Sequence, residues 1–348
     1  PEMDYIQDAK NKGVEIIGEL EIAYRIGSGN YIAITGTNGK TTTTTLVGEI
    51  FERAKRKNFV VGNIGVAVIS ASINADEDAW MITETSSFQL ETTKYFKPVI
   101  SAILNITPDH LDRHHTMEAY GAAKAKIFEN QQEDGYLIIN YDDKECYKLR
   151  KGCKAKIVPF SAKEELKFGA FVKNNKIVIK NKAGELITIC GADELKIIGI
   201  HNLRNALAAA AISYFAGIDA EIIGEAIKNF GGVEHRIEYC GEIDGIKFYN
   251  DSKGTNVDAA LTAIRAIKDN IILIAGGDGK SQSFDEFIKG FNGYVKKLIL
   301  LGKDANIIAK AADDNGFKDY IFAKDMNECV VKAIEMAIPG DTVLLSPA

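Results

Sequence analysis

A lysine and a run of threonines follow two glycines near the start of the chain, in the segment TGTNGKTTTTT at 35–45. The segment lies between a short apolar, β-branched run and a stretch with helical character, which is where a phosphate-binding loop belongs. Gly36 and Gly39 would let backbone N–H groups approach phosphate oxygens. Lys40 would add a positive charge, and the Thr41 hydroxyl is a suitable ligand for Mg²⁺. The loop is a shortened form, because an isoleucine stands where the longer pattern has its first glycine. The ordinary alternative is a tight turn before a helix.

Carboxylate and imidazole groups follow two further predicted strands. Glu84 comes directly after the buried run WMIT, at the end of a strand where ligands bind in open α/β sheets. Its carboxylate suits Mg²⁺, although a capping or surface glutamate would look the same in the sequence. The segment DHLDRHH at 109–115 places His110 and His114 four residues apart, a spacing that on a helix could hold a metal. The simpler interpretation leaves His114 and His115 exposed, and we assign no role to either.

Four polar side chains of the second half, Lys253, Thr255, Lys280 and Ser346, each follow a predicted strand. The carboxyl ends of parallel strands meet at one edge of a sheet, so we expect these side chains to cluster. Ammonium and hydroxyl groups gathered at such an edge suit an anionic ligand. The segment GGDGK around Lys280 is weak evidence by itself, because surface turns have the same composition.

Hydrophobic patterning predicts the elements that position these groups. Strands are predicted at 31–35, 80–83, 99–104 and 136–140, and helices at 41–54, 118–130 and 202–216. Short β-like runs between 154 and 198, ending with LKIIG, predict a local antiparallel sheet. After residue 232 strand and helix alternate, which predicts a parallel sheet. The expected fold class is α/β, with a central P-loop-type ATPase domain that has a mostly parallel sheet and a C-terminal Rossmann-like α/β domain.

Composition excludes several classes of protein. The chain has 348 residues, with 42 Lys and Arg against 48 Asp and Glu, a net charge of −6. With 46% hydrophobic residues it can bury a large core, which excludes global disorder. The mild acidity argues against nucleic acid as a partner, and the longest apolar stretch, at 206–218, is too short for a membrane span. Five scattered cysteines without a CxxC pattern fit a reducing compartment, so we expect a cytoplasmic protein.

Several motifs occur in an order that resembles the Mur ligase family. They are GTNGKTTT, TETSSFQLE, ILNITPDHLDRH, GIHNLRNALAA, HRIE, NDSKGTN, GGDGKS and LLSPA. Members of this family are ATP-dependent, ADP-forming amide ligases that activate a carboxylate as an acyl phosphate. SSFQLE and LLSPA favour the branch that adds D-glutamate to UDP-N-acetylmuramoyl-L-alanine during peptidoglycan precursor synthesis. The resemblance therefore implies these two substrates and a role in cell wall biogenesis and cell division.

The resemblance also implies roles for individual residues. The catalytic residues would be Lys40, Glu84, His110 and Lys124. Two Mg²⁺ ions would be held by Thr41, Glu84, His110 and Lys124, the lysine being carbamylated by CO₂. ATP would contact Gly36, Thr37, Asn38, Gly39, Lys40, Thr41, Thr42, Asn202, Asn205, Arg236 and Asp251. The other substrates would contact Asn63, Ser86, Lys253, Thr255, Lys280 and Ser346. Without the resemblance, Lys124 would be taken for a solvated lysine, and the pair Asn202 and Asn205 for helix caps.

The resemblance further predicts how the chain is divided. Residues 27–232 would form the central ATP-binding domain and 233–348 a truncated amino-acid-binding domain. Residues 1–26 would be the remnant of a missing UDP-binding domain, so we expect a monomeric fragment that binds Mg·ATP but ligates poorly. The alternatives are another Mur-type ligase, against which SSFQLE and LLSPA argue, and a non-catalytic ATP-binding relative. The second alternative would have lost Lys40, Glu84, His110 or Lys124, and all four are present.

Overall fold

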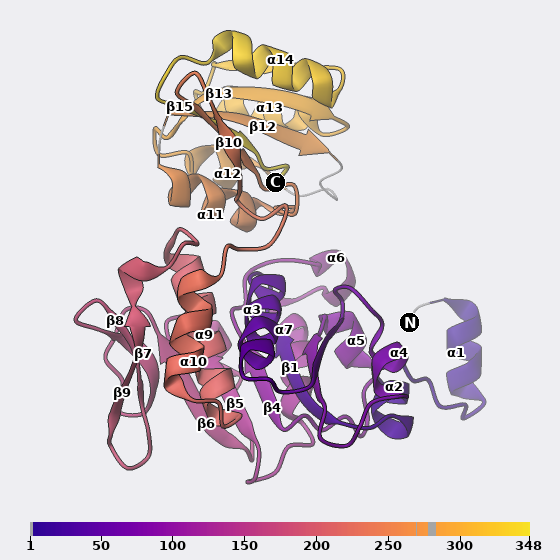
Figure 1. The fold of residues 1–348 in the computed structure, drawn as a ribbon. Coiled ribbons are helices and arrows are strands. Elements are labelled where there is room, and N and C mark those ends of the chain that lie inside the picture. The colour runs from indigo at the N-terminus through magenta and orange to yellow at the C-terminus, as the bar shows by residue number, and fades with distance from the viewer. Residues whose placement is uncertain (1–2, 269, 278–282) are drawn as a thin grey trace. The chain divides into compact units, whose positions relative to one another are not determined.

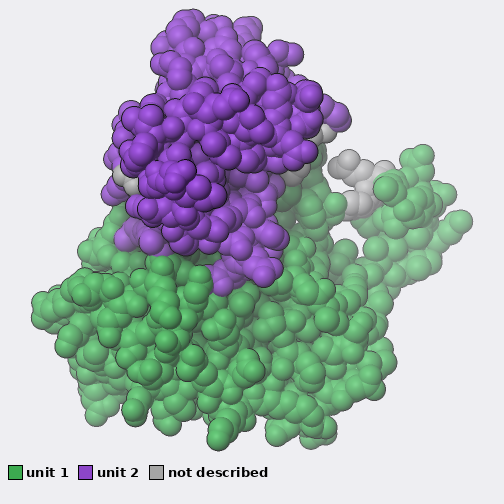
Figure 2. Space-filling model, turned by 45° about the horizontal axis from the view of Figure 1, so that its top comes forward, with its two compact units in different colours: residues 1–197, 201–231 green, residues 198–200, 232–348 purple. Residues whose placement is uncertain are grey.

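The computed structural model describes residues 3–268, 270–277 and 283–348. The chain forms two compact units, which are coloured separately in Figure 2. Unit 1 comprises residues 1–197 and 201–231, and unit 2 comprises residues 198–200 and 232–348. Among the described residues, no helix is both long enough and apolar enough to cross a membrane.

Unit 1 is built on a nine-stranded sheet (Figure 1). Its strands are β1 (Asn30–Thr35), β2 (Asn58–Gly62), β3 (Trp80–Glu84), β4 (Ile100–Ile103), β5 (Tyr136–Asn140), β6 (Lys156–Ser161), β7 (Gly169–Lys173), β8 (Lys176–Lys180) and β9 (Leu186–Gly191). Its helices are α1 (Asp4–Asn11), α2 (Glu19–Ile26), α3 (Lys40–Arg53), α4 (Val68–Ser72), α5 (Ser87–Glu91), α6 (Leu111–His114), α7 (Met117–Ala125), η1 (Lys126–Phe128), α8 (Lys144–Lys148), η2 (Ala192–Glu194), α9 (Ile200–Phe215) and α10 (Ala220–Asn229). The strand order is β2-β3-β1-β4-β5-β6-β7-β8-β9.

The mostly parallel sheet predicted for this region is confirmed. The first seven strands in this order, from β2 through β1 to β7, pair in parallel. Strands β7, β8 and β9 pair antiparallel and extend the same sheet. The central residues Ile32, Ala33 and Ile34 are fully buried, because helices cover both faces of a parallel sheet. The strand expected at LKIIG is wrong: Gly199 takes a positive φ of 93° and Ile200 begins α9 instead. The apolar run at β2 was not predicted, because it is short and carries no period.

Unit 2 contains a six-stranded sheet in the order β10-β11-β15-β12-β13-β14. The strands are β10 (Glu238–Ile243), β11 (Ile246–Asn250), β12 (Asn270–Gly277), β13 (Val295–Gly302), β14 (Tyr320–Phe322) and β15 (Asp341–Leu345), and the helices are α11 (Val257–Ile267), α12 (Asp285–Lys289), α13 (Ala305–Asp314) and α14 (Met326–Met336). All strands except β10 are parallel, as the strand–helix alternation predicts. Asn250 pairs with Leu345, so the segments that follow β11 and β15 leave the sheet side by side.

Candidate functional site

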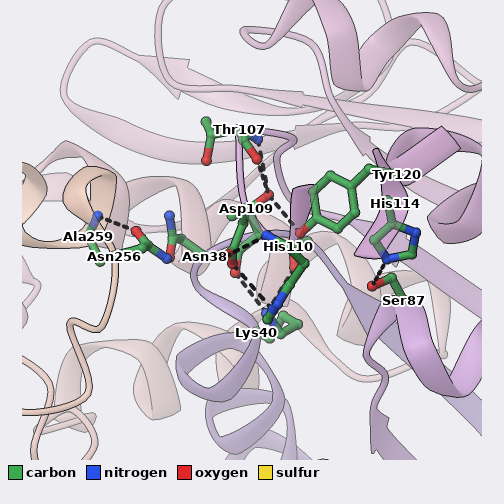
Figure 3. A network of polar contacts seen from close by, with 12 residues as sticks. Asn38, Lys40, Ser87, Thr107, Asp109, His110, His114, Tyr120, Asn256 and Ala259 are labelled. Atoms are coloured by element: carbon green, nitrogen blue, oxygen red, sulfur yellow. Dashed lines mark hydrogen bonds and ion pairs between the residues drawn. The ribbon is translucent and has the colours of Figure 1, made fainter. Parts of the chain in front are cut away.

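The glycine-containing loop joins β1 to α3 in unit 1, as a phosphate-binding loop does. Gly39 adopts a left-handed conformation with φ of 84°, and a Cβ atom there would lie 2.3 Å from the Asn205 side-chain oxygen. Nζ of Lys40 donates hydrogen bonds to the carbonyl oxygens of Gly36, at 2.9 Å, and Thr37, at 2.7 Å (Figure 3). The lysine ammonium is therefore held against the loop, at the N-terminus of a helix whose dipole favours an anion.

Asn105, which follows β4, clamps this loop and was not singled out from the sequence. Its Oδ1 accepts from the backbone N–H of Asn38 at 2.8 Å, and its Nδ2 donates to the Asn38 carbonyl at 2.8 Å. The Thr37 hydroxyl donates to the Thr107 carbonyl at 3.1 Å and accepts from the Thr107 N–H at 3.0 Å. The segment that follows β4 therefore fixes the conformation of the loop. In the sequence, the only sign of this role is the asparagine that begins the motif NITPDH.

Glu84 ends β3 beside β1, opposite Ile34 in the sheet register. The carboxylate is 2% exposed, its Oε1 accepts from Nδ2 of Asn63 at 3.0 Å, and its Oε2 has no hydrogen-bond partner among the described residues. An unpartnered buried carboxylate oxygen is costly, and a bound cation would satisfy it. Thr41, 9% exposed, lies in the first turn of α3. These two oxygen ligands fit Mg²⁺, which takes its remaining ligands from water and phosphate.

No group of three histidine, cysteine or carboxylate side chains that could hold a metal occurs within the described ranges. The described residues therefore contain no preformed metal site made of such side chains alone. Mg²⁺ at phosphate-transfer sites is usually bound by one or two protein groups together with the substrate, so the pair Thr41 and Glu84 remains the better fit.

Lys124, on α7, is 1% exposed, which reverses the solvated position that its sequence context suggests. Its Nζ donates to the Gly36 carbonyl at 2.9 Å, the same oxygen that Lys40 contacts. Burial, reinforced by the charge of Lys40, lowers the pKa of Lys124 well below its ordinary value. The ammonium is thereby destabilised, and the neutral amine, which is the nucleophilic form, is favoured.

His110 precedes α6 with a positive φ of 53°, and its Nε2 lies 3.6 Å from Oδ2 of Asp109. His114, expected to be exposed, is 7% exposed, so that expectation is wrong. Its Nε2 lies 3.0 Å from Oγ of Ser87 (Figure 3), because α6 packs its last residue against α5. Burial is the main cause that lowers the pKa of His114. His115 is exposed as expected.

Ser86, Asn202 and Asn205 occupy helical positions in unit 1. Ser86 caps α5: its hydroxyl accepts from the Gln89 N–H at 3.2 Å, and the Gln89 side chain accepts from the Ser86 N–H at 2.9 Å. Asn202 and Asn205 are buried on α9, with a hydrogen bond of 3.2 Å between their side chains. The predicted residues of unit 1 thus divide into a set around the loop and a capping residue, Ser86.

Asp251 and Ser346 meet in unit 2, after the paired strands β11 and β15. Oγ of Ser346 donates to Oδ2 of Asp251 at 2.8 Å, and the Ile237 N–H donates to Oδ1 at 3.2 Å. Asp251 is 2% exposed, and burial raises its pKa to about 6, although Ser346 and Arg236 oppose the rise. Arg236 is therefore electrostatically coupled to this carboxylate.

The other three predicted residues of unit 2 differ from this pair. Lys253 and Thr255 lie exposed on the loop that follows Asp251, and the Lys253 N–H donates to the His235 carbonyl at 3.1 Å. Lys280 lies outside the described residues. The fold thus brings Arg236, Asp251 and Ser346 together and leaves two polar groups open to a ligand.

A loop between a parallel strand and a helix, with a lysine at the helix start, defines an α/β protein built to bind phosphate groups. The chain belongs to the Mur ligase family: residues 34–213 match the Mur ligase middle domain, and residues 235–348 match the Mur ligase glutamate ligase domain. A relative from Thermoanaerobacter sp. (strain X514), named UDP-N-acetylmuramoylalanine--D-glutamate ligase, is 52% identical over 99% of this chain and 76% of its own length. A protein of the same name from Clostridioides difficile (strain 630) is 47% identical over 100% of this chain and 77% of its own length.

Solved structures of the family share the fold. MurF from Acinetobacter baumannii superposes with a TM-score of 0.71 at 18% identity, covering 94% of this chain and 75% of that one. MurF ligase from Thermotoga maritima in complex with ADP gives 0.69 at 18% identity, covering 94% of this chain and 78% of that one. At such identity the likeness speaks for the fold alone, and it supports the predicted α/β fold class.

Proposed function

We propose that this chain is an ATP-dependent, ADP-forming ligase that adds D-glutamate to UDP-N-acetylmuramoyl-L-alanine. The observation that carries the proposal is a match of about half of all residues, along the whole chain, to proteins of that name. The site supports it, because Lys40 and Lys124 donate hydrogen bonds to the phosphate-type loop and the buried carboxylate of Glu84 ends the neighbouring strand β3. Such a site suits transfer of a phosphoryl group to a substrate carboxylate, for which a protein nucleophile is not required.

The first half-reaction would transfer the γ-phosphoryl group of ATP to the substrate carboxylate, giving an acyl phosphate and ADP. Lys40 would neutralise charge on the phosphates, and the loop N–H groups would orient them. When bound at Thr41 and Glu84, Mg²⁺ would supply further charge neutralisation. Phosphoryl transfer depends mainly on such positioning and electrostatic stabilisation. The D-glutamate amine would then attack the acyl carbon and release phosphate, which leaves an amide.

The surroundings of Lys124 support its carbamylation. Its neutral Nζ would attack the carbon of CO₂, form an N–C bond and lose one proton to solvent, so that the ammonium site becomes an anion. That change places an anion where burial and the charge of Lys40 disfavour an ammonium, and the positive charge of Lys40 would stabilise the carbamate. The carbamate oxygens, together with the imidazole of His110, would be ligands for a second Mg²⁺.

Substrate-binding residues are proposed in each unit. Asn63, which donates to the Glu84 carboxylate, is proposed to lie near the muramoyl group. Lys253, Thr255, Lys280 and Ser346 are proposed to hold the two carboxylates of D-glutamate. Asn202, Asn205, Arg236 and Asp251 are proposed for ATP. A cytoplasmic location, a monomeric state and the division at residue 232 stay predictions from the sequence.

The test is direct. The protein is incubated with ATP, Mg²⁺, UDP-N-acetylmuramoyl-L-alanine and D-glutamate, and the products are identified by mass spectrometry and phosphate release. We expect an amide product only with D-glutamate, in a panel that also contains L-glutamate, L-lysine and D-alanine. Ligation of another amino acid in preference to D-glutamate would contradict the proposal, and the same panel tests the expectation of weak turnover.

A further inference from the structure

The tertiary structure brings a serine, a histidine and a glutamate together in unit 1. Oγ of Ser87 lies 3.0 Å from Nε2 of His114, and Nδ1 of His114 lies 3.4 Å from Oε1 of Glu91. Ser87 and Glu91 are the first and last residues of α5, and His114 is the last residue of α6. The order of groups is that of a nucleophilic triad, which is recognised by geometry and not by sequence position.

Burial argues against a nucleophile. Ser87 is 2% exposed and His114 is 7% exposed, whereas a nucleophilic hydroxyl has to reach the substrate. Arg113 closes the group on another side, since its guanidinium bonds to Oε2 of Glu91 and stacks over the Phe88 ring at 4.3 Å. The three side chains therefore act on the protein itself.

The His114 ring touches aromatic neighbours on two sides. It stacks on Phe88, with ring centroids 5.6 Å apart and planes inclined by 20°, and it packs against Tyr120 at 5.2 Å. The Phe88 ring in turn meets the His110 ring edge-on at 4.8 Å. One face of His114 is thus one ring away from a predicted catalytic residue.

The other neighbour, Tyr120, leads to the phosphate loop. Its hydroxyl lies 3.3 Å from the Thr37 hydroxyl, and Nζ of Lys124 lies 4.6 Å from the centre of its ring. Figure 3 shows Ser87, His114 and Tyr120 in this sequence beside the loop. His114 is therefore one side chain away from both predicted catalytic groups, His110 and Lys124.

We propose that Ser87, His114 and Glu91 form a positioning network that fixes α6 and, through Phe88 and Tyr120, the side chains of His110 and Lys124. α6 needs such an anchor because it has only four residues and is flanked by two positive φ angles, 53° at His110 and 63° at His115. The effect of the network on catalysis, through His110 and Lys124, rests on the proposed ligase function. Its structural effect, which is to hold α6 in place, is independent of that function.

Four variants test the network: His114→Phe, Ser87→Ala, the double variant of these two, and His114→Gln. Phenylalanine keeps the ring between Phe88 and Tyr120 but removes both nitrogens. We expect His114→Phe to lower kcat by about ten-fold while KM for ATP and the Kd for ADP change by less than about two-fold, the pattern of a group that acts on catalytic geometry. The double variant should lower kcat no further than His114→Phe alone does, because the two substitutions break the same hydrogen bond, that between Ser87 and His114. His114→Gln, which restores an amide donor and acceptor, should recover part of kcat.

A second measurement is independent of ligase activity. Trypsin cleavage after Arg113 requires α6 to open, and we expect His114→Phe to speed this cleavage several-fold. His115→Asn, at the exposed neighbouring histidine and compatible with a positive φ, is the matched control and should match the wild type in both assays. If the wild type itself shows no ligase activity, the proposed function fails, and the cleavage rates still decide the network.

Three results would overturn the proposal. Unchanged kcat in His114→Phe despite faster cleavage would reduce the network to a purely structural role. Additive losses in the double variant would show that Ser87 and His114 do not act together. Labelling of Ser87 by a fluorophosphonate probe, which reacts with nucleophilic serines, would make the group a nucleophilic triad after all.

Discussion

Each unit buries an ionisable group at the carboxyl edge of its sheet, Lys124 in unit 1 and Asp251 in unit 2. Burial favours the neutral form of both, since it lowers the pKa of Lys124 and raises that of Asp251 to about 6. The neighbours differ. Lys40 pushes the lysine pKa further down, whereas Ser346 and Arg236 pull the aspartate pKa back. Unit 1 therefore favours the neutral amine of Lys124, and unit 2 keeps a hydrogen-bonded anchor, Asp251.

The same contrast extends to the surrounding residues. In unit 1 the loop, the lysines and Glu84 are locked by side chains from other elements, among them Asn105 and Asn63. Of the predicted residues of unit 2 that the structure describes, the anchor Asp251 and its partner Ser346 are buried, whereas Lys253 and Thr255 are exposed. Preorganised buried groups suit a chemical step, while exposed polar groups on a loop suit the capture of a small polar ligand.

The largest effect is expected from removing the amine of Lys124. Lys124→Ala should lower ligase activity by on the order of a thousand-fold, because the proposed carbamate and its metal contact are lost together. Short carboxylates such as acetate or formate should restore part of the activity by occupying the vacated site. Lys148→Ala is the matched control, since that lysine is exposed and forms a surface ion pair with Glu145. Full activity of Lys124→Ala would remove the contrast between the two units.

The clamp on the loop comes next. Asn105→Ala removes both hydrogen bonds to the Asn38 backbone, each worth about 1 kcal/mol. Because the two bonds together amount to about 2 kcal/mol, we expect KM for ATP to rise by about thirty-fold, measured by steady-state phosphate release. Asn58→Ala, which loses one exposed hydrogen bond to the Arg56 carbonyl, should leave KM unchanged. Equal KM values for the two variants would mean that the loop is held without Asn105.

The anchor in unit 2 predicts a pH dependence of stability. The raised pKa means that the folded state binds more protons than the unfolded state between pH 3.8 and about 6. The stability contributed by Asp251 is therefore fully present below that window and is lost as the pH rises through it, by on the order of 2–3 kcal/mol.

Asp251→Asn should remove this dependence. Urea unfolding of wild type and variant at pH 4 and pH 7 measures it: the wild type should lose stability relative to the variant at the higher pH. Asp244→Asn, at an exposed turn, serves as the control and should follow the wild type. A constant difference between wild type and Asp251→Asn at both pH values would contradict the raised pKa.

The smallest effect concerns Ser86. Because its hydroxyl caps α5, Ser86→Ala should lower the free energy of unfolding by about 1 kcal/mol, measured by urea denaturation. KM for the muramoyl substrate should stay near the wild-type value. A clear rise in that KM would instead add Ser86 to the substrate-binding residues, as the sequence motif suggests.

Much of the fold follows from local pattern. The runs at β1, β3 and β5 and the helix after the loop are predicted within one or two residues, since apolar β-branched runs and glycine turns are local signals. LKIIG was predicted wrongly because an apolar run does not reveal that its final glycine, Gly199, takes a left-handed conformation. The short strand β14 was not predicted, because three residues carry no measurable period.

The sequence by itself determined the loop, the order of the motifs and the family that they resemble, because these depend on residue identity and spacing. Only the tertiary structure decided that Lys124 is buried beside Lys40, that Asn105 clamps the loop, and that His114 meets Ser87 and Glu91. The physical reason is that pKa and hydrogen bonding depend on burial and on neighbours from distant segments. Lysines and histidines with the same local sequence can therefore be solvated or catalytic, and packing determines which.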